Sequence, residues 1–164
     1  MNASIISVHP EDQAEVLELM TRVICTSVTQ DVNLQASYIK NVTQNLAWWA
    51  ENPTLGCHLK AVNQQMIVGV VLIKNYWNLC SLFVAPDHHR QGIGRALVNA
   101  AIAECQGKSE KPAIRLNAAP NAMPFYKAIG FELRESQQPQ PPGVKPMQFI
   151  FKRSPLQSRT ENHR

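Results

Sequence analysis

Long hydrophobic runs are missing from this chain of 164 residues. No run of about 18 apolar residues occurs, so we expect no segment to span a membrane. The first residues, MNASIISVHPED, also lack the basic start and the long apolar stretch of a secretion signal. We therefore expect a cytoplasmic protein. The composition, 45% hydrophobic and 17% charged, is ordinary for one globular domain with a core.

Closely spaced cysteines are also missing. The four cysteines lie more than twenty residues apart, and no CxxC pair occurs. This spacing favours reduced, mostly buried thiols and implies neither a disulfide framework nor a zinc site. We therefore expect no metal cofactor. The four are Cys25, Cys57, Cys80 and Cys105.

Two common nucleotide-binding motifs are incomplete at the one glycine-rich turn, which lies in HHRQGIGRAL (88–97). A P-loop ends in Gly-Lys-Ser/Thr, but here Gly94 is followed by Arg95 and Ala96. A dinucleotide fingerprint needs a third glycine or alanine at the position that Leu97 occupies. The sequence therefore supports neither a nucleotide hydrolase nor a nicotinamide-dependent enzyme.

Charge is unevenly distributed along the chain, which has a net charge of +4 and a pI near 9.0. Residues 1–86 hold four Lys/Arg and six Asp/Glu, whereas residues 87–164 hold twelve and six. The positive half contains the glycine turn, which suits an anionic ligand there. No element interleaves aromatic and basic residues, so we expect no nucleic-acid partner.

The hydrophobic periodicity predicts an α+β (mixed α/β) fold. We expect one domain over residues 1–153, followed by a polar, disordered tail over 154–164. Helices are expected from Pro10, over 34–51, from Gly92 to about Gln106, and over 121–129. Strands are expected over 4–9, 55–62, 66–74, 77–84, 113–117, 131–136 and 147–153.

Glycines at the point where a strand becomes a helix favour an anion site. Gly92 and Gly94 allow a tight turn whose N–H groups point one way, and the first N–H groups of the following helix add partial positive charge. Together these groups make a site for a pyrophosphate. Arg90 and Arg95 can supplement it, because guanidinium groups match phosphate oxygens.

Two stretches, LFVAPDHHRQGIGRAL and NAMPFYKAIGFE, resemble the GNAT superfamily of acetyl-CoA-dependent N-acetyltransferases. The resemblance implies a twisted, mostly antiparallel sheet of about seven strands flanked by about four helices. It also implies an enzyme that moves the acetyl group of acetyl-CoA to a primary amine by direct attack. The alternative is a non-catalytic sensor or regulatory module of the same fold that only binds acyl-CoA.

The same resemblance implies the coenzyme-binding residues. The family's loop is written Gln/Arg-x-x-Gly-x-Gly/Ala, and His89 departs from it at the first position. The end of the preceding strand would pair with the pantetheine arm, and the N–H of Phe83 or Val84 would polarise the thioester carbonyl. The implied set is Leu82, Phe83, Val84, His89, Arg90, Gln91, Gly92, Ile93, Gly94, Arg95, Asn117 and Asn121.

Tyr126 matches the family's tyrosine that protonates the departing coenzyme thiolate, so the resemblance implies that it is the general acid. Asn117 and Asn121 compete as the asparagine that reaches the coenzyme arm, since the usual position, seven residues before the tyrosine, holds Ala119. Asn121 can also cap the short helix that carries Tyr126.

The general base and the acceptor stay open. The strand YWNLCSLFV has no carboxylate, which leaves His58 or a chain of water molecules as the base and Cys80 as a remote acetyl relay. By resemblance, the two N-terminal helices, residues 26–35 and the loop before the last strand form the acceptor site. Asp31, Glu51, Trp48 and Trp49 are candidates for binding a cationic or aromatic amine. The acceptor is expected to be a small-molecule amine or the amine of a protein or peptide. The chain is expected to be a monomer or a homodimer.

Overall fold

The computed structural model describes residues 3–152, which contacts divide into two compact units with a boundary between Glu110 and Lys111. The tail predicted over 154–164 lies outside the described residues. That residues 1–153 form a single domain stays a prediction. Within the described range, no helix is both long and apolar enough to cross a membrane.

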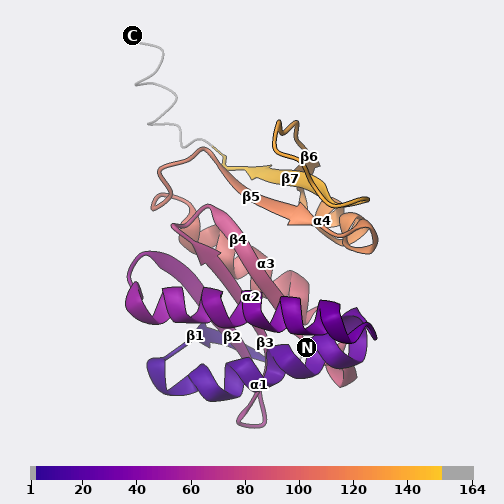
Figure 1. Ribbon diagram of the computed structural model, residues 1–164. Helices are drawn as coiled ribbons and strands as arrows, with labels where there is room; N and C mark the ends of the chain where they lie inside the picture. Colours follow the sequence, from indigo (N-terminus) through magenta and orange to yellow (C-terminus); the bar gives the residue numbers. More distant parts are fainter. Residues whose placement is uncertain (1–2, 153–164) are drawn as a thin grey trace. The chain divides into compact units, whose positions relative to one another are not determined.

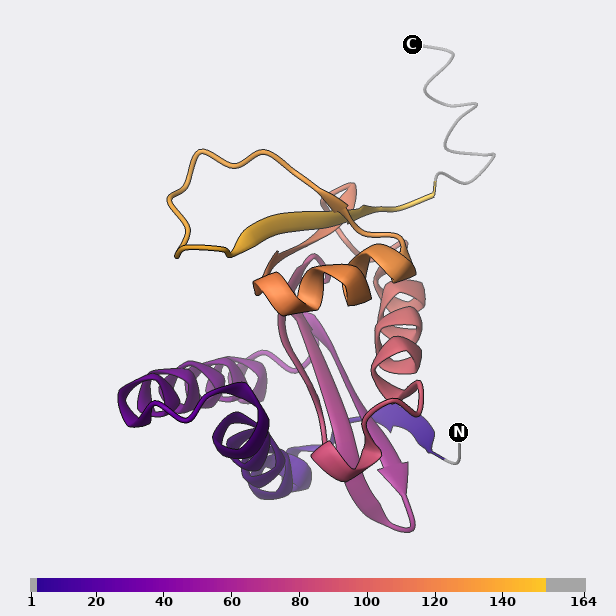
Figure 2. The same cartoon turned by 90° about the vertical axis from the view of Figure 1, so that its right-hand side faces the viewer.

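The first unit is a four-stranded antiparallel sheet with helices on both faces (Figure 1). Its strands pair in the order β1-β2-β3-β4, and α1 and α2 lie on one side of them while α3 lies on the other (Figure 2). The strands are β1 (Ser4–Ser7), β2 (Gly56–Asn63), β3 (Met66–Lys74) and β4 (Asn78–Val84). The helices are α1 (Gln13–Val23), α2 (Val32–Glu51) and α3 (Ile93–Cys105).

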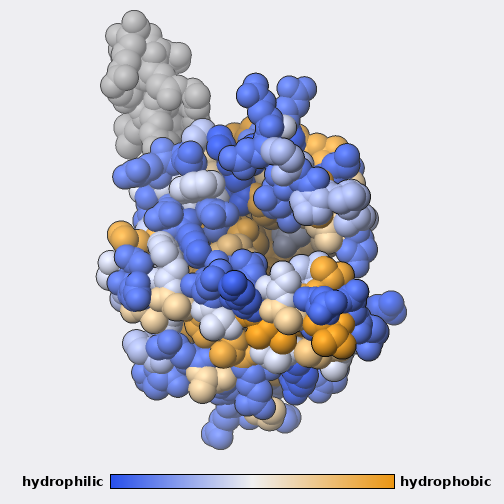
Figure 3. Space-filling view, viewed as in Figure 1, coloured by the Kyte–Doolittle hydropathy of each residue, from blue (hydrophilic) through white to orange (hydrophobic). Residues whose placement is uncertain are grey.

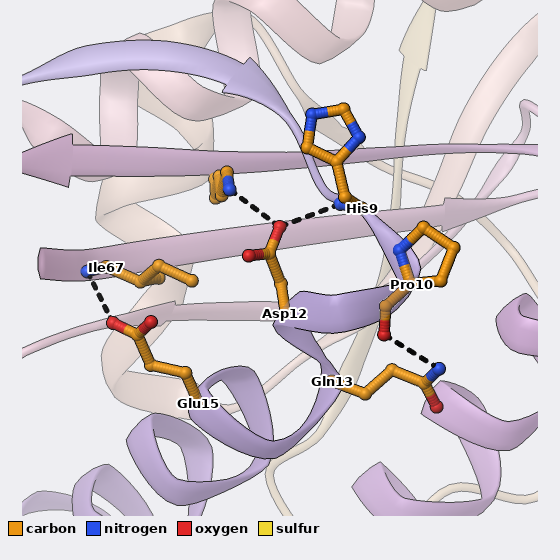
Figure 4. Close-up of polar contacts among 7 residues, drawn as sticks. His9, Pro10, Asp12, Gln13, Glu15 and Ile67 are labelled. Atoms are coloured by element: carbon orange, nitrogen blue, oxygen red, sulfur yellow. Dashed lines mark hydrogen bonds and ion pairs between the residues drawn. The ribbon is translucent and has the colours of Figure 1, made fainter. Parts of the chain in front are cut away.

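Carboxylates tie the start of α1 to the sheet (Figure 4). Asp12 accepts hydrogen bonds from the N–H of His9 at 2.7 Å and from Nζ of Lys60, on β2, at 2.6 Å. Glu15 accepts from the N–H of Ile67, on β3, at 2.9 Å. Burial alone would raise the pKa of Asp12, but the bonds from Lys60 and His9 outweigh it and the pKa is lowered. The carboxylate therefore stays ionised and paired at neutral pH.

The second unit is a smaller antiparallel sheet with one helix. Strand β7 pairs with β5 on one side and with β6 on the other. The rings of Tyr126, Phe131 and Phe149 contact one another in sequence, with centroids 5.4 and 5.5 Å apart. These contacts hold the helix to the strands. The elements are β5 (Ala113–Ala118), α4 (Met123–Ile129), β6 (Glu132–Leu133) and β7 (Lys145–Ile150).

The α+β prediction, with seven strands and four α-helices over residues 3–152, is confirmed, but several predicted boundaries are wrong. Helix α2 begins at Val32 instead of residue 34, because the carboxylate of Asp31 accepts from two N–H groups of its first turn. The strand expected over 131–136 is only two residues long. The last strand begins at Lys145 instead of 147, and it includes Pro146, whose carbonyl accepts from the N–H of Arg134.

Close packing between α3 and β3 depends on Gly69. A Cβ at this position would lie 2.9 Å from Cδ1 of Leu97 and 3.2 Å from Cγ2 of Ile93, both on α3. Those two side chains are among the least exposed in the unit. The missing side chain thus lets the first two turns of α3 lie directly on the strand.

We expect Gly69→Val to lower the free energy of unfolding by about 1–3 kcal/mol, because the added methyl groups overpack this contact. Gly69→Ala should cost less, since one Cβ can be accommodated by a shift of the Leu97 side chain. Denaturant unfolding of the two variants measures the difference. Equal stability of Gly69→Val and the unmodified chain would contradict the packing argument.

Candidate functional site

The glycine turn connects the end of β4 to the start of α3. The N–H of Ala85 donates to the carbonyl of Val68, which extends the pairing of β3 and β4 by one bond. A 3₁₀ turn over Pro86–His88 follows, and Arg90 then has a φ of 64°. Gly92 is the N-cap of α3 with a φ of 80°, a conformation that favours glycine. The turn predicted from the two glycines is therefore present.

Four N–H groups at the start of α3 have no acceptor within the helix. The first helical bond runs from the N–H of Ala96 to the carbonyl of Gly92, and no side chain caps the helix within the described residues. The unused groups are the N–H groups of Gly92, Ile93, Gly94 and Arg95. A Cβ at Gly92 would meet nothing within 4 Å, so open space adjoins these donors. Such an arrangement fits a diphosphate.

The side chain of His89 is turned back onto the sheet. Its Nε2 donates a hydrogen bond of 2.7 Å to the carbonyl of Val84, the last residue of β4. This contact gives a structural role to the residue that departs from the family's loop pattern. The side chains of Arg90, Gln91 and Arg95 are exposed around the turn.

Strand β4 contains an irregularity four residues before its end. Leu72 pairs with Ser81 and Ile73 with Leu79, so Cys80 is an extra residue on β4. Beyond it, Leu82, Phe83 and Val84 are half-buried at the end of the strand. Burial raises the pKa of the Cys80 thiol to about 11, and its Sγ lies 3.6 Å from the carbonyl of Leu72. A thiol that stays protonated at neutral pH is a poor acetyl relay.

The second unit carries Tyr126 and the two asparagines. Tyr126, on α4, is 8% exposed, and burial raises its pKa to about 12. Asn117 is exposed on β5. Asn121 does not cap the helix as predicted: it lies inside a 3₁₀ turn over Pro120–Ala122, and Ala122 is the N-cap of α4. Pro120 begins this 3₁₀ turn three residues before Met123, the first residue of α4.

Comparison with known proteins identifies the family. Residues 29–145 match the family model described as an acetyltransferase (GNAT) domain. The chain belongs to the GNAT acetyltransferase family. This confirms the resemblance seen in the two sequence stretches around Gly92 and Tyr126.

Solved GNAT structures share the fold at low sequence identity. A GCN5-related N-acetyltransferase from Rhodopseudomonas palustris has a TM-score of 0.75 and 18% identity, with 92% of this chain and 97% of that chain covered. PaiA N-acetyltransferase from Thermoplasma acidophilum, in complex with coenzyme A, has a TM-score of 0.73 and 16% identity (92% and 100% covered). YncA, a putative acetyltransferase from Salmonella typhimurium with its cofactor acetyl-CoA, has a TM-score of 0.71 and 16% identity (94% and 96% covered).

His58 is buried in this GNAT chain. It lies on β2, is 6% exposed, and its ring contacts that of Trp49 edge-on at 4.6 Å. Burial lowers the pKa of His58 to about 4, although the Asp12 carboxylate opposes the shift. Its Nδ1 is buried and has no hydrogen-bond partner among residues 3–152. A base this weak and this enclosed does not suit proton removal from an amine.

Three of the four candidate acceptor residues have structural roles in the first unit. Asp31 caps α2, Trp49 is in the core, and the half-buried Trp48 ring lies 5.2 Å from Nζ of Lys74. Glu51 is exposed at the end of α2. Figure 3 shows in orange that apolar residues are exposed to solvent on the face that carries α2, some of them over α2 itself. From the end of α1 into α2 the exposed ones are Val28, Val32, Leu34 and Tyr38.

No group of three or more metal-ligating side chains occurs in the part of the chain that the structure describes. Two of the cysteines, Cys57 and Cys105, are buried, as predicted, while Cys25 and Cys80 are half-buried.

The pH dependence of stability tests the burial of His58. In the unfolded chain its pKa returns to about 6.5, so between pH 6.5 and 4 only the unfolded state binds the proton. The contribution of the neutral, buried His58 to the free energy of unfolding is complete above pH 6.5. It falls by about 3 kcal/mol as the pH is lowered to 4. Between pH 7 and pH 4, we expect the free energy of unfolding of His58→Leu to fall by about 3 kcal/mol less than that of the unmodified chain. The same pH slope in both proteins would contradict the burial argument.

Proposed function

We propose that this chain transfers the acetyl group of acetyl-CoA to a primary amine. The observation that carries the proposal is the start of α3, where four unused N–H groups adjoin open space at Gly92. The similar PaiA structure is a complex with coenzyme A, and the similar YncA structure holds its cofactor acetyl-CoA, which supports the same ligand for this chain.

The coenzyme diphosphate would accept hydrogen bonds from the N–H groups of Gly92 to Arg95, with the exposed Arg90 and Arg95 side chains adding charge. The pantetheine arm would follow main-chain groups at the end of β4. The N–H of Ala85 donates to the carbonyl of Val68 on β3, and the N–H groups of consecutive strand residues face opposite edges. The N–H of Phe83 therefore also faces β3, where Phe83 pairs with Val70, and the N–H of Val84 is the donor proposed for the thioester carbonyl.

Tyr126 is proposed to donate a hydrogen bond to the departing sulfur. With a pKa of about 12, it would lose about 5 kcal/mol by complete proton transfer to a thiolate of pKa about 8.5. A hydrogen bond to a sulfur that is still partly bonded to carbon avoids most of this cost. The same high pKa keeps the phenol protonated throughout the neutral range.

Removal of the amine proton is assigned to water. Strand β4 has no carboxylate, Cys80 stays a thiol and His58 is enclosed in the core. The amine must be neutral to attack, so an acceptor whose amine is already partly neutral, or a water chain to solvent, meets the requirement.

A non-catalytic acyl-CoA-binding module is the alternative, and the missing carboxylate on β4 favours it. Release of free thiol from acetyl-CoA in the presence of a panel of primary amines separates the two functions. Amine-dependent release above the background of hydrolysis supports catalysis. Tight coenzyme binding with no release from any amine in the panel would support the module.

The diphosphate site is tested by Gly92→Asp with Gly107→Asp as its matched control. Both glycines have positive φ values, 80° and 92°, and open space where a Cβ would lie, but Gly107 follows the opposite end of α3. We expect Gly92→Asp to lower coenzyme A affinity by about 100-fold, because like charges brought together cost several kcal/mol. Gly107→Asp should retain the affinity. Calorimetric titration measures the coenzyme A affinity of both variants. An equal loss of affinity in the two would contradict the assignment of the diphosphate to the start of α3.

Replacing Tyr126 by Phe tests its role in the reaction. We expect kcat to fall by about 100-fold, in line with the contribution of one positioned proton donor, while coenzyme A affinity changes little. Tyr76→Phe is the control, since the Tyr76 hydroxyl donates to the carbonyl of Thr54 within the first unit. Steady-state kinetics with the best amine of the panel give the answer. Unchanged kcat in Tyr126→Phe would exclude this tyrosine from the mechanism.

A further inference from the structure

We propose that the second unit binds an oxyanion, a carboxylate or a phosphate, at Arg115 and Arg134, and that this group belongs to the amine acceptor. The assignment to the acceptor rests on the proposed function. The anion site itself rests on the contacts of the two arginines.

The two arginines lie on the same face of the second sheet, on opposite sides of β7. Arg115, on β5, pairs with Gln148, and the N–H of Arg134 donates to the carbonyl of Pro146, two residues before Gln148 on β7. Residues two apart on a strand share a face, so both arginines belong to that of Gln148. The pKa of Arg134 is lowered first by burial and then by the charge of Arg115. The two cations are therefore close enough to repel each other.

Neither guanidinium forms an ion pair with a residue of the described range. The Nε atoms of Arg115 and Arg134 are both buried without a hydrogen-bond partner among residues 3–152. The ion pairs found in that range involve neither arginine. Glu132, the acid opposite Gln148, accepts from the Gln148 side chain at 3.1 Å. Arg134 donates from Nη1 to the carbonyl of Glu135 at 3.4 Å, which leaves Nε unused.

Buried donors without partners are costly, and two such donors on adjacent cations are unusual. An anion with two oxygens offsets the repulsion, because it can accept from the outer N–H groups of the two guanidinium forks, and its charge also stabilises the buried Nε donors. Carboxylates and phosphates share this geometry.

Arg134 also lines an open pocket of about 460 Å³ in the loop that leads into β7. Lys145 and the hydroxyl-bearing Ser136 line the same pocket, and none of the described residues that line it is acidic. Gly143 has a φ of 82°, and a Cβ there would lie 2.7 Å from Cγ of Pro120, so the loop packs closely on the segment before α4. The pocket is therefore a positively charged recess held by its own unit.

An acceptor with an anionic group fits this recess better than a polyamine. Arg134 and Lys145 line the recess, and Arg115 adds its charge beside Arg134. These cations repel an amine that carries only positive charge and attract one that also carries a carboxylate or a phosphate. The loop before the last strand is one wall of the acceptor site expected from the resemblance. The substrate class that follows is an amine with an oxyanion attached, such as an amino acid or a phosphorylated amine.

Nuclear magnetic resonance of the arginine Nε–H groups tests the anion site without any turnover. Sodium acetate and inorganic phosphate are the probes, with sodium chloride at equal ionic strength as the reference. We expect saturable shifts of the Arg115 and Arg134 signals with acetate or phosphate, and a higher Tm by mass action. In Arg134→Gln, the anion should no longer shift the Arg115 signal or raise the Tm. Both effects should persist in the control Arg22→Gln, which changes an exposed arginine on α1.

Absent shifts, shifts equal to those with chloride, or unchanged Arg115 shifts in Arg134→Gln would overturn the anion site. A stronger response to acetate assigns the site to a carboxylate, and a stronger response to phosphate assigns it to a phosphate. Arg134→Gln also removes the repulsion between the two arginines, so its Tm without added anion should equal or exceed that of the unmodified chain.

Paired acceptors test the link to the substrate. An amino acid is compared with its amide, and phosphoethanolamine with ethanolamine. We expect Arg134→Gln to raise KM by about tenfold or more for the anionic member of the preferred pair and to leave the neutral member unchanged. A preference for the neutral members, or an equal rise for both, would overturn the inference alone. Shifts of the arginine signals without acetylation of any amine would instead refute the proposed function and retain the anion site.

Discussion

The close contact between α3 and Gly69 is the constraint on which the rest of the first unit depends. Ile93 and Leu97 can lie on β3 only because residue 69 has no side chain. Since β3 pairs with β4, the same contact fixes the start of the helix relative to the end of β4. The helix N–H groups and the strand end thus belong to one rigid arrangement, which a pre-organised anion site requires.

The sequence predicts this part of the molecule well because strong local signals agree with the packing. Apolar periodicity indicates α3, and a glycine occupies its N-cap, where φ is positive. Predictions failed where the signal is weak or where tertiary contacts decide. Nothing in the local pattern shows that Asn121 lies inside a 3₁₀ turn, or that the last strand includes Pro146. The place of Asn121 depends on the adjacent Pro120, which begins the turn. The extent of the last strand depends on the backbone hydrogen bond from Arg134 to Pro146, which joins residues distant in sequence.

Side-chain sites built from several strands are hidden for a related reason. Arg115 and Arg134 are nineteen positions apart in the sequence, and each looks like an ordinary surface arginine of a basic half. Their juxtaposition follows from the register of β5, β7 and β6, which periodicity does not specify. By contrast, His89 was visible as a departure from the family pattern, and its bond to the Val84 carbonyl supplies the reason that the sequence lacked.

The two units divide the proposed chemistry according to the kind of group that each supplies. The first unit offers main-chain N–H groups, which recognise phosphate and thioester oxygens whatever side chains surround them. The second offers side chains, namely a buried phenol and two arginines whose charges are not neutralised by the described residues. Substitution readily changes such side chains while the backbone site persists. In the proposed function, recognition of the coenzyme diphosphate therefore depends on the backbone of the first unit, whereas recognition of an anionic group on the acceptor depends on side chains of the second.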